Sequence, residues 1–284
     1  MRDTPPHTGQ PAQGGNRFAA MFFLRKRSDY CIIPSFAIFA EGKNDKAGGT
    51  TVITMKKIRI HSEAAYLFAL VLMALSVAMT ASADFGVSMI VAPAYILSLK
   101  FSFLTFGQSE YIVQALLFIV FCILVKRVRL VYFVSFLTAL IYGGVLDLWR
   151  SVIPILNPSV TAPGSMELWL RVTLFTAGMV MTALTVALFF RSYIYPQVYD
   201  FFVKGISAHF GLNMDRFKII FDFSCLAVAC AMTLLFFGRF NGVGIGTVIM
   251  TCINGLLIGM FGKLIDRCFV FVPLFPKLEE KMRL

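Results

Sequence analysis

Glu63–Ser82 reads EAAYLFALVLMALSVAMTAS, a run in which Glu63 is the only charged residue. At a rise of about 1.5 Å per residue, a helix of this length reaches about 30 Å, the thickness of a bilayer's hydrocarbon core. Backbone groups inside a bilayer must hydrogen-bond to one another, so such a run predicts a transmembrane helix. The sequence therefore predicts an all-α membrane bundle, because five further runs have the same character: Gln108–Val125, Leu130–Trp149, Leu168–Phe190, Phe217–Phe237 and Val243–Gly262.

The composition of the whole chain agrees with this fold class. Its 284 residues are 58% hydrophobic and 14% charged, whereas soluble domains have about 45–50% apolar and about 25% charged residues. So few charged side chains cannot cover a water-exposed surface, which excludes a soluble enzyme, a disordered chain and a disulfide scaffold. The net charge of +11 fits the Lys and Arg that collect in cytoplasmic loops, and we expect no nucleic-acid partner.

The sequence contains no motif for catalysis or for metal binding. Its six cysteines form no CxxC pair, and three histidines are too few for a histidine-based metal centre. HExxH and GxSxG motifs are also missing from the sequence. We therefore expect a protein that is not an enzyme and that holds no metal and no cofactor.

Residues 1–54 differ from the rest of the chain. They contain the stretch TPPHTGQPAQGG and no run long enough to span a bilayer. The basic segment Met55–Arg59 directly precedes the first apolar run, so we expect translation to begin at Met55 and residues 1–54 to be an upstream extension or a disordered tail. This basic segment, the apolar run and Ala81-Ser82-Ala83 also resemble a cleavable signal peptide. We favour an uncleaved helix, because the internal repeat of the chain requires it.

Two further segments either cross the membrane or only enter it. Asp84–Phe106 is apolar but contains Pro93, and Ser192–Phe210 contains Pro196 and several charged residues. Short loops rich in Lys and Arg face the cytoplasm, and the cluster Lys126-Arg127-Val128-Arg129 does so only if neither segment crosses. We therefore predict six spans, two re-entrant or interfacial segments, and both termini in the cytoplasm.

The chain resembles two copies of one unit, 55–157 and 158–270, followed by a cytoplasmic tail, 271–284. In each copy a span precedes a Pro-containing segment, a Phe-Gly pair and two more spans; Pro93 and Pro196 are 103 positions apart. Three spans per unit is an odd number, so the second copy is inverted relative to the first. Inverted repeats with broken helices near the bilayer midplane are typical of secondary transporters. The alternative is a duplicated scaffold that transports nothing.

Three stretches carry a family resemblance: FGVSMIVAPAYILS (85–98), YGGVLDLW (142–149) and GVGIGTVIMTCINGLLIG (242–259). In this order, and with six spans, they resemble the YczE/YitT-like group of uncharacterised bacterial inner-membrane proteins over about Met55 to Asp266. The resemblance implies a bacterial cytoplasmic-membrane location and no known substrate. It places that group's Gly-Thr pair at Gly246-Thr247 and its Gly-x-x-x-Asp helix end at Gly143–Asp147. The second unit departs from the pattern, because Lys263 precedes Asp266.

Polar side chains at membrane depth are candidates for a substrate path, because they tend to face the bundle interior. Glu110 and Gln114 lie one turn apart on one face of the second span, and Glu110 has no obvious local partner. Asp222 follows Lys218 by four residues in the fifth span, where a structural ion pair is the alternative. Asn254 lies deep in the sixth span and either packs across helices or binds a ligand.

Two more acidic candidates are predicted at the outer ends of helices. Asp147 lies three residues before Arg150, so it either contributes to the path or forms a surface ion pair. Asp84 opens the segment that contains Pro93, where it would make a good helix N-cap.

Helix breaks are predicted at the two prolines and at the glycine-rich stretch Gly242-Val243-Gly244-Ile245-Gly246. Glycines four residues apart let helices approach closely, and an unwound stretch could instead present carbonyl groups to a ligand. No strand precedes this GxGxG pattern, so it is a weak indication of nucleotide binding.

These features together predict a transporter of a small molecule or an ion, with a midplane site between inverted repeats. Its partners would be the lipid bilayer, the unknown solute, and a second copy of the chain or another membrane protein. The alternative is a non-transporting membrane protein that assembles or regulates another complex.

Overall fold

The structure is a computed structural model that describes residues 30–32, 54–56, 58–126, 130–194 and 197–275. The chain divides into two compact units, Met1–Lys56 and Lys57–Leu284. In the first unit, strand β1 (Tyr30–Ile32) pairs antiparallel with β2 (Thr54–Lys56). The rest of the extension predicted over residues 1–54 lies outside the described residues.

The second unit contains six helices long and apolar enough to cross a membrane. They begin and end close to the predicted runs, except that the last continues beyond Gly262 to Cys268. The prediction of an all-α membrane bundle with six spans is confirmed, and the chain is a multi-pass membrane protein. The six helices are α1 (Ser62–Ala83), α3 (Phe106–Val125), α4 (Leu130–Val152), α5 (Leu168–Phe189), α7 (Met214–Phe237) and α8 (Ile245–Cys268).

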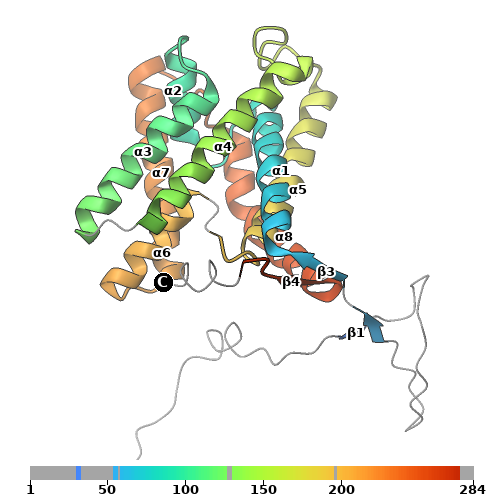
Figure 1. Cartoon of the computed structure of the whole chain (residues 1–284). Coiled ribbons are helices and arrows are strands. Elements are labelled where there is room, and N and C mark those ends of the chain that lie inside the picture. The colour runs from blue at the N-terminus through green and yellow to red at the C-terminus, as the bar shows by residue number, and fades with distance from the viewer. Residues whose placement is uncertain (1–29, 33–53, 57, 127–129, 195–196, 276–284) are drawn as a thin grey trace, which may run out of the picture. The chain divides into compact units, whose positions relative to one another are not determined.

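Two shorter helices lie in the ambiguous segments. Helix α2 (Ala92–Lys100) has 9 residues and α6 (Val198–Phe210) has 13. They reach about 14 Å and about 20 Å, too short for a core of about 30 Å. Figure 1 shows α2 at one end of the bundle and α6 at the opposite end. Both segments therefore enter the bundle without crossing it, as predicted.

Pro93 begins a helix rather than interrupting one. It lies in the first turn of α2, where the N–H that proline lacks has no intrahelical partner in any case. Pro196, the second predicted break, lies outside the described residues.

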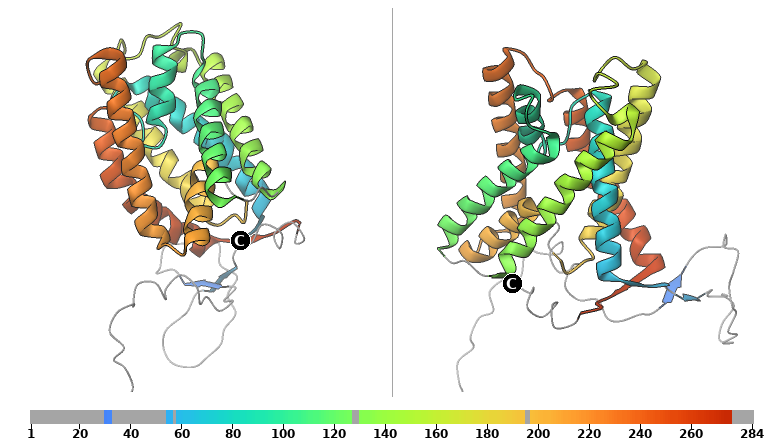
Figure 2. Two further views of the ribbon diagram at one scale, coloured as in Figure 1. Left: turned by 90° about the vertical axis from the view of Figure 1, so that its left-hand side faces the viewer. Right: turned by 45° about the horizontal axis from the view of Figure 1, so that its top comes forward.

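The order of the helices repeats along the chain. A long helix, a short one and two long ones form α1–α4, and the same order forms α5–α8. The 3₁₀ helix η2 (Pro154–Leu156) and a loop connect the two sets, so the predicted boundary at 157–158 falls in this connection. Helix α1 packs along α5, α2 packs on α7, and α6 packs on α3; Figures 1 and 2 show the first and last of these pairs side by side.

The two ends of the bundle unit meet in a small sheet that the sequence does not predict. Strand β3 (Ile58–His61) pairs in parallel with β4 (Phe269–Val272). Glu63, in the first turn of α1, accepts hydrogen bonds from the backbone N–H groups of Leu274 (2.9 Å) and Phe275 (3.1 Å). The start of α1 and the end of α8 therefore lie at the same end of the bundle, as an even number of spans requires.

Aromatic packing fixes the short helix α6 against α3. The rings of Phe121 and Phe201 lie 4.6 Å apart between centroids, and both side chains are buried. Gly205 permits this close approach, because a Cβ there would lie 2.4 Å from the Phe121 ring. The first turn of α6 is thereby held inside the bundle.

Candidate functional site

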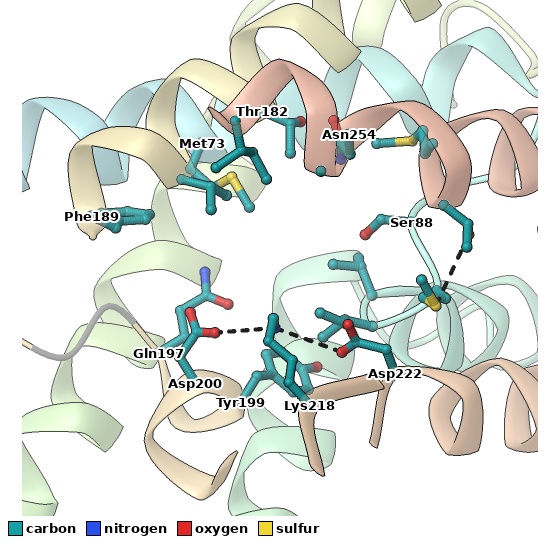
Figure 3. A pocket seen from close by; sticks show the side chains of 18 of the residues that line it. Met73, Ser88, Thr182, Phe189, Gln197, Tyr199, Asp200, Lys218, Asp222 and Asn254 are labelled. Carbon is teal, nitrogen blue, oxygen red and sulfur yellow. Dashed lines mark hydrogen bonds and ion pairs between the residues drawn. The ribbon is translucent and has the colours of Figure 1, made fainter. Parts of the chain in front are cut away.

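A cavity of about 390 Å³ lies inside the bundle, lined mostly by the second helix set. We call it the main cavity. Its walls come from α1, α5 and α8 on one side and from α6 and α7 on the other, and the connection before α2 closes one edge. Figure 3 shows Met73, Thr182 and Asn254 on the first wall, opposite Asp200 and Asp222. Most of the remaining lining is apolar.

An ion-pair network forms the charged wall of the main cavity. Lys218 Nζ lies 3.5 Å from Asp200 Oδ1 and 3.7 Å from Asp222 Oδ1. The predicted Lys218–Asp222 pair is therefore present, and Asp200 joins it from α6. These distances exceed the roughly 2.7–2.9 Å of a tight charge-assisted bond. One ammonium group is thus shared loosely by two carboxylates.

Lys204 adds a second basic group on the next turn of α6. Burial lowers the pKa of its ammonium group; the nearby Asp200 raises that pKa, and Lys218 lowers it. Lys204 does not line the main cavity, but its charge and that of Lys218 offset the charges of the two aspartates. A site of this kind suits a solute that carries its own hydrogen-bonding or charged head group.

Asn254 faces the ion-pair network across the main cavity (Figure 3). Its Oδ1 is buried and accepts no hydrogen bond from any residue that the structure describes. The predicted alternative, a hydrogen bond across helices, is not found for this oxygen among those residues. The geometry thus leaves an acceptor available to a ligand.

Glu110 and Gln114 form a buried cluster behind this wall. Both side chains have no exposed surface. Gln114 Nε2 and the Tyr199 hydroxyl both donate to Glu110 Oε2, at 3.1 and 2.9 Å. The backbone N–H of Val198 donates to Gln114 Oε1 at 3.2 Å. Glu110 itself does not line the main cavity, but Tyr199 touches both.

Asp147 and Asp84 lie away from the main cavity and act on helix ends. Asp147 accepts hydrogen bonds from the Gly107 N–H at 2.8 Å and from the Thr105 hydroxyl, so it caps the start of α3. No ion pair between Asp147 and Arg150 is found in the described part of the chain. This capping role replaces the predicted surface pair.

The N-cap prediction for Asp84 is wrong. Asp84 is the C-cap of α1, in a left-handed conformation with φ of 55°, and the N-cap of α2 is Val91. The reason is that irregular chain separates the two helices. Arg171 Nη2 donates to the Asp84 carbonyl at 2.9 Å and lies 3.4 Å from its carboxylate, which neutralises the end of α1.

The glycine-rich stretch Gly242–Gly246 packs closely against the connection before α2. Gly246 N–H donates to the Phe85 carbonyl at 2.8 Å. A Cβ on Gly244 would lie 2.6 Å from that same oxygen, so no larger residue fits. Of the two predicted roles, close packing is the one that the geometry supports, and none of these glycines lines the main cavity.

Several residues of the site escape prediction from the sequence. Tyr199 and Asp200 are among them, because Ser192–Phe210 is recognisable from its composition only as a poor span. Their position shortly after Pro196 is an available signal. Outside the site, the sequence also did not predict that Arg191 binds both carboxylate oxygens of Asp266 at 2.9 Å.

A comparison with curated proteins and with solved structures finds no significant match. One protein family matches the chain over residues 60–263, a range that holds the main cavity and the buried cluster. This range covers well over half of the 284 residues. The chain therefore belongs to DUF6198, a family of unknown function.

Proposed function

We propose that the protein transports a small solute or ion across a bacterial inner membrane through the main cavity. The observation that carries the proposal is the cavity itself, inside a six-span bundle. It places a charged wall opposite an Asn254 oxygen that has no hydrogen-bond partner among the described residues. Polar groups at membrane depth are costly, and those that a protein retains there usually mark a path or a site.

The helix arrangement supports an inverted repeat. Helices α2 and α6 occupy corresponding places in the repeated order and enter from opposite ends (Figure 1). Their contacts are reciprocal, because α2 packs on α7 of the second set and α6 packs on α3 of the first. Broken helices at the interface of inverted repeats form the binding sites of many secondary transporters.

The two sets differ at one place, and the main cavity lies there. Helix α3 packs along α4, whereas the corresponding helices α7 and α8 are not a packed pair within the described residues. Lys218 and Asp222 of α7 and Asn254 of α8 instead face each other across the main cavity. A motion of α5 and α8 against α6 and α7 would open the main cavity to either side.

The size and lining of the main cavity favour a small amphipathic solute. A volume of about 390 Å³ lies in the range of about 300–1,000 Å³ that is usual for small-molecule sites. Apolar groups such as Met73 and Phe189 would hold the body of the solute, and Asn254 and the Lys218 network would hold its polar head.

Charge supports an orientation with both termini in the cytoplasm. The basic sequence Lys126-Arg127-Val128-Arg129 directly follows α3, whose last turn lies at the same end of the bundle as β3 and β4 (Figure 1). The positive-inside rule assigns this end to the cytoplasm. The resemblance to the YczE/YitT-like group favours the same inner-membrane location.

Uptake into proteoliposomes tests the proposal. Purified protein is first screened by thermal shift against panels of amino acids, amines, carboxylates and nucleosides, and labelled forms of the hits are then offered to the vesicles. We expect at least one hit to enter faster than into protein-free vesicles. If no hit moves, transport is refuted and a non-transporting membrane partner becomes the better account.

Two matched glycine variants locate the path. Gly255 lines the main cavity, and Gly259 lies one turn further along α8, outside it. Outside its own helix, no described atom lies within 4 Å of a Cβ built at either position. Gly255→Leu fills the main cavity and should reduce uptake at least tenfold, whereas Gly259→Leu should not. Equal uptake by both variants would exclude the main cavity as the path.

A further inference from the structure

Glu110 is an acid that lies inside the bundle, with no charged partner among the residues that the structure describes. Its side chain has no exposed surface. None of the ion pairs found among the described residues involves it. Its Oε2 accepts two hydrogen bonds, whereas its Oε1 is buried and has no hydrogen-bond partner in the described part of the chain.

This asymmetry between the two oxygens fits a carboxylic acid better than a carboxylate. A buried carboxylate without a cation is strongly unfavourable, and such a group usually takes up a proton instead. In the neutral acid one oxygen is a carbonyl acceptor and the other carries hydrogen. Oε2 accepts from two neutral donors, as a carbonyl oxygen does, which leaves Oε1 as the atom that would carry the proton of a neutral acid.

The titratable groups around Glu110 come from three helices packed on α3. Tyr199 faces it from α6, Tyr142 of α4 interacts with it electrostatically, and Tyr95 of α2 packs on Phe106 one turn away. Burial raises the pKa of Tyr199 well above its usual value and that of Tyr95 to about 12. These two hydroxyls therefore stay neutral at physiological pH, and their charge does not change with that of Glu110.

Two charged side chains lie near the start of α3, and a thiol lies on α7 beyond Tyr199. Arg150 stacks on Phe106 with its guanidinium 5.3 Å from the ring centroid, and Asp147 is hydrogen-bonded to the Gly107 backbone. Cys225 of α7 interacts with Tyr199 rather than with Glu110. Glu110 is thus the group in this cluster that can gain or lose a proton.

The cluster is connected to the main cavity through a single turn of α6. Tyr199 donates to Glu110 and also lines the main cavity. The next residue, Asp200, pairs with Lys218 in the cavity wall. A solute that displaces the Lys218 network would act on this turn of α6. A proton that binds to or leaves Glu110 would act on the same turn.

We propose that Glu110 is the proton-binding site of this transporter and that the first turn of α6 couples it to the solute. This inference rests on the transport function proposed above. In the present conformation the carboxyl group holds its proton on Oε1. When the first turn of α6 moves and water reaches the group, the O–H bond breaks, the proton passes to water, and the carboxylate is left solvated.

Infrared difference spectroscopy of the purified protein in lipid tests the proton site without any solute. The protein carries ¹³C-labelled glutamate, so that bands of Glu carboxyl groups are separated from those of Asp. A titration from about pH 5 to about pH 9 covers the range in which a buried Glu releases its proton. We expect a protonated-carboxyl band that disappears within this range. Its absence from the wild-type protein would overturn the proposal by itself, even if no variant folds.

Three variants assign the band. Glu110→Gln should abolish it, and Glu167→Gln, which changes an exposed acid, should leave it unchanged. Tyr199→Phe removes a donor that stabilises the carboxylate, so it should shift the midpoint to higher pH. A band that survives in Glu110→Gln would overturn the assignment.

Uptake measurements separate this inference from the transport function. If the band titrates but no solute moves, Glu110 binds a proton and transport fails. If solute moves and Glu110→Gln makes uptake independent of pH, both proposals are supported. If uptake by Glu110→Gln keeps the wild-type pH dependence, the coupling is refuted and transport stands.

Discussion

The Tyr199 hydroxyl donates a hydrogen bond of 2.9 Å to Glu110 Oε2, across 89 positions of sequence. This bond joins α3 of the first helix set to α6 of the second inside the bundle. Glu110 is fully buried, and Tyr199, which donates to it, is followed directly by Asp200 of the ion-pair network that lines the main cavity. Coupling of the proposed proton site to the proposed solute site depends on this bond.

Tyr199→Phe should destabilise the protein. The variant leaves the buried Glu110 Oε2 with a single donor, and loss of one partner of a buried polar group costs about 1–3 kcal/mol. A lower thermal midpoint in detergent is the expected result. Tyr111→Phe is the control, because its hydroxyl bonds to the Leu140 carbonyl at the exposed surface and should cost less. Equal losses would argue against the importance of the buried bond.

Removal of the Lys218 ammonium group alone should lower the thermal stability more than removal of Lys218 and Asp222 together. Lys218→Met leaves the carboxylates of Asp200 and Asp222 facing each other. A partly buried charge that has lost its partner lowers the free energy of unfolding by up to about 3 kcal/mol. The double variant Lys218→Met with Asp222→Asn removes one of the repelling charges and should recover part of the lost thermal stability. A double variant that is no more stable than the single one would contradict the shared-ammonium geometry.

Gly107→Ala should disrupt the crossing of α3 and α4. An added Cβ would lie 2.1 Å from the Gly143 carbonyl and 2.6 Å from Asp147 Oδ2, so the two helices must separate. Overpacking of this kind costs about 1–3 kcal/mol or more. The yield of monodisperse protein on size exclusion should fall, whereas Gly255→Ala, which meets open space, should retain it. Normal yield and stability of Gly107→Ala would show that the helices cross elsewhere.

Arg191 and Asp266 should be energetically coupled. Arg191 Nε and Nη2 each lie 2.9 Å from an Asp266 oxygen, and Nη2 also donates to the Gly262 carbonyl. Both side chains are partly exposed, so solvent limits the pair to about 1 kcal/mol. A double-mutant cycle with Arg191→Ala and Asp266→Ala should measure a coupling of this size. Strict additivity of the two substitutions would exclude the pair.

The six spans could be predicted from the sequence because each depends on local composition. In a bilayer, the backbone groups of about twenty apolar residues must hydrogen-bond within the same segment, whatever surrounds it. Pro93 and the charges after Ser192 marked two segments as ambiguous, and the basic cluster Lys126-Arg127-Val128-Arg129 predicted that neither crosses. The extension of α8 to Cys268 was not predicted; Asp266 in this extension pairs with Arg191, which follows α5 in the fold and is distant in sequence.

The site was predictable only in part. The Lys218–Asp222 pair and the shared face of Glu110 and Gln114 follow from helical spacing alone. The contact of Glu110 with Tyr199 depends on how α6 folds back into the bundle, which local sequence does not specify. Asp84 was placed wrongly because irregular chain separates α1 from α2, so Asp84 ends α1 instead of beginning α2.

Accessibility of the main cavity from the two sides of the membrane tests the central claim most directly. Native cysteines are replaced first, and a cysteine is then introduced at Thr251, which lines the main cavity, or at Leu256 on the exposed face of α8. A membrane-impermeant maleimide is offered to right-side-out and to inside-out vesicles. An alternating path predicts that Thr251→Cys reacts from both sides and that Leu256→Cys reacts from neither. Reaction of Thr251→Cys from one side only, or from neither, would contradict transport through the main cavity.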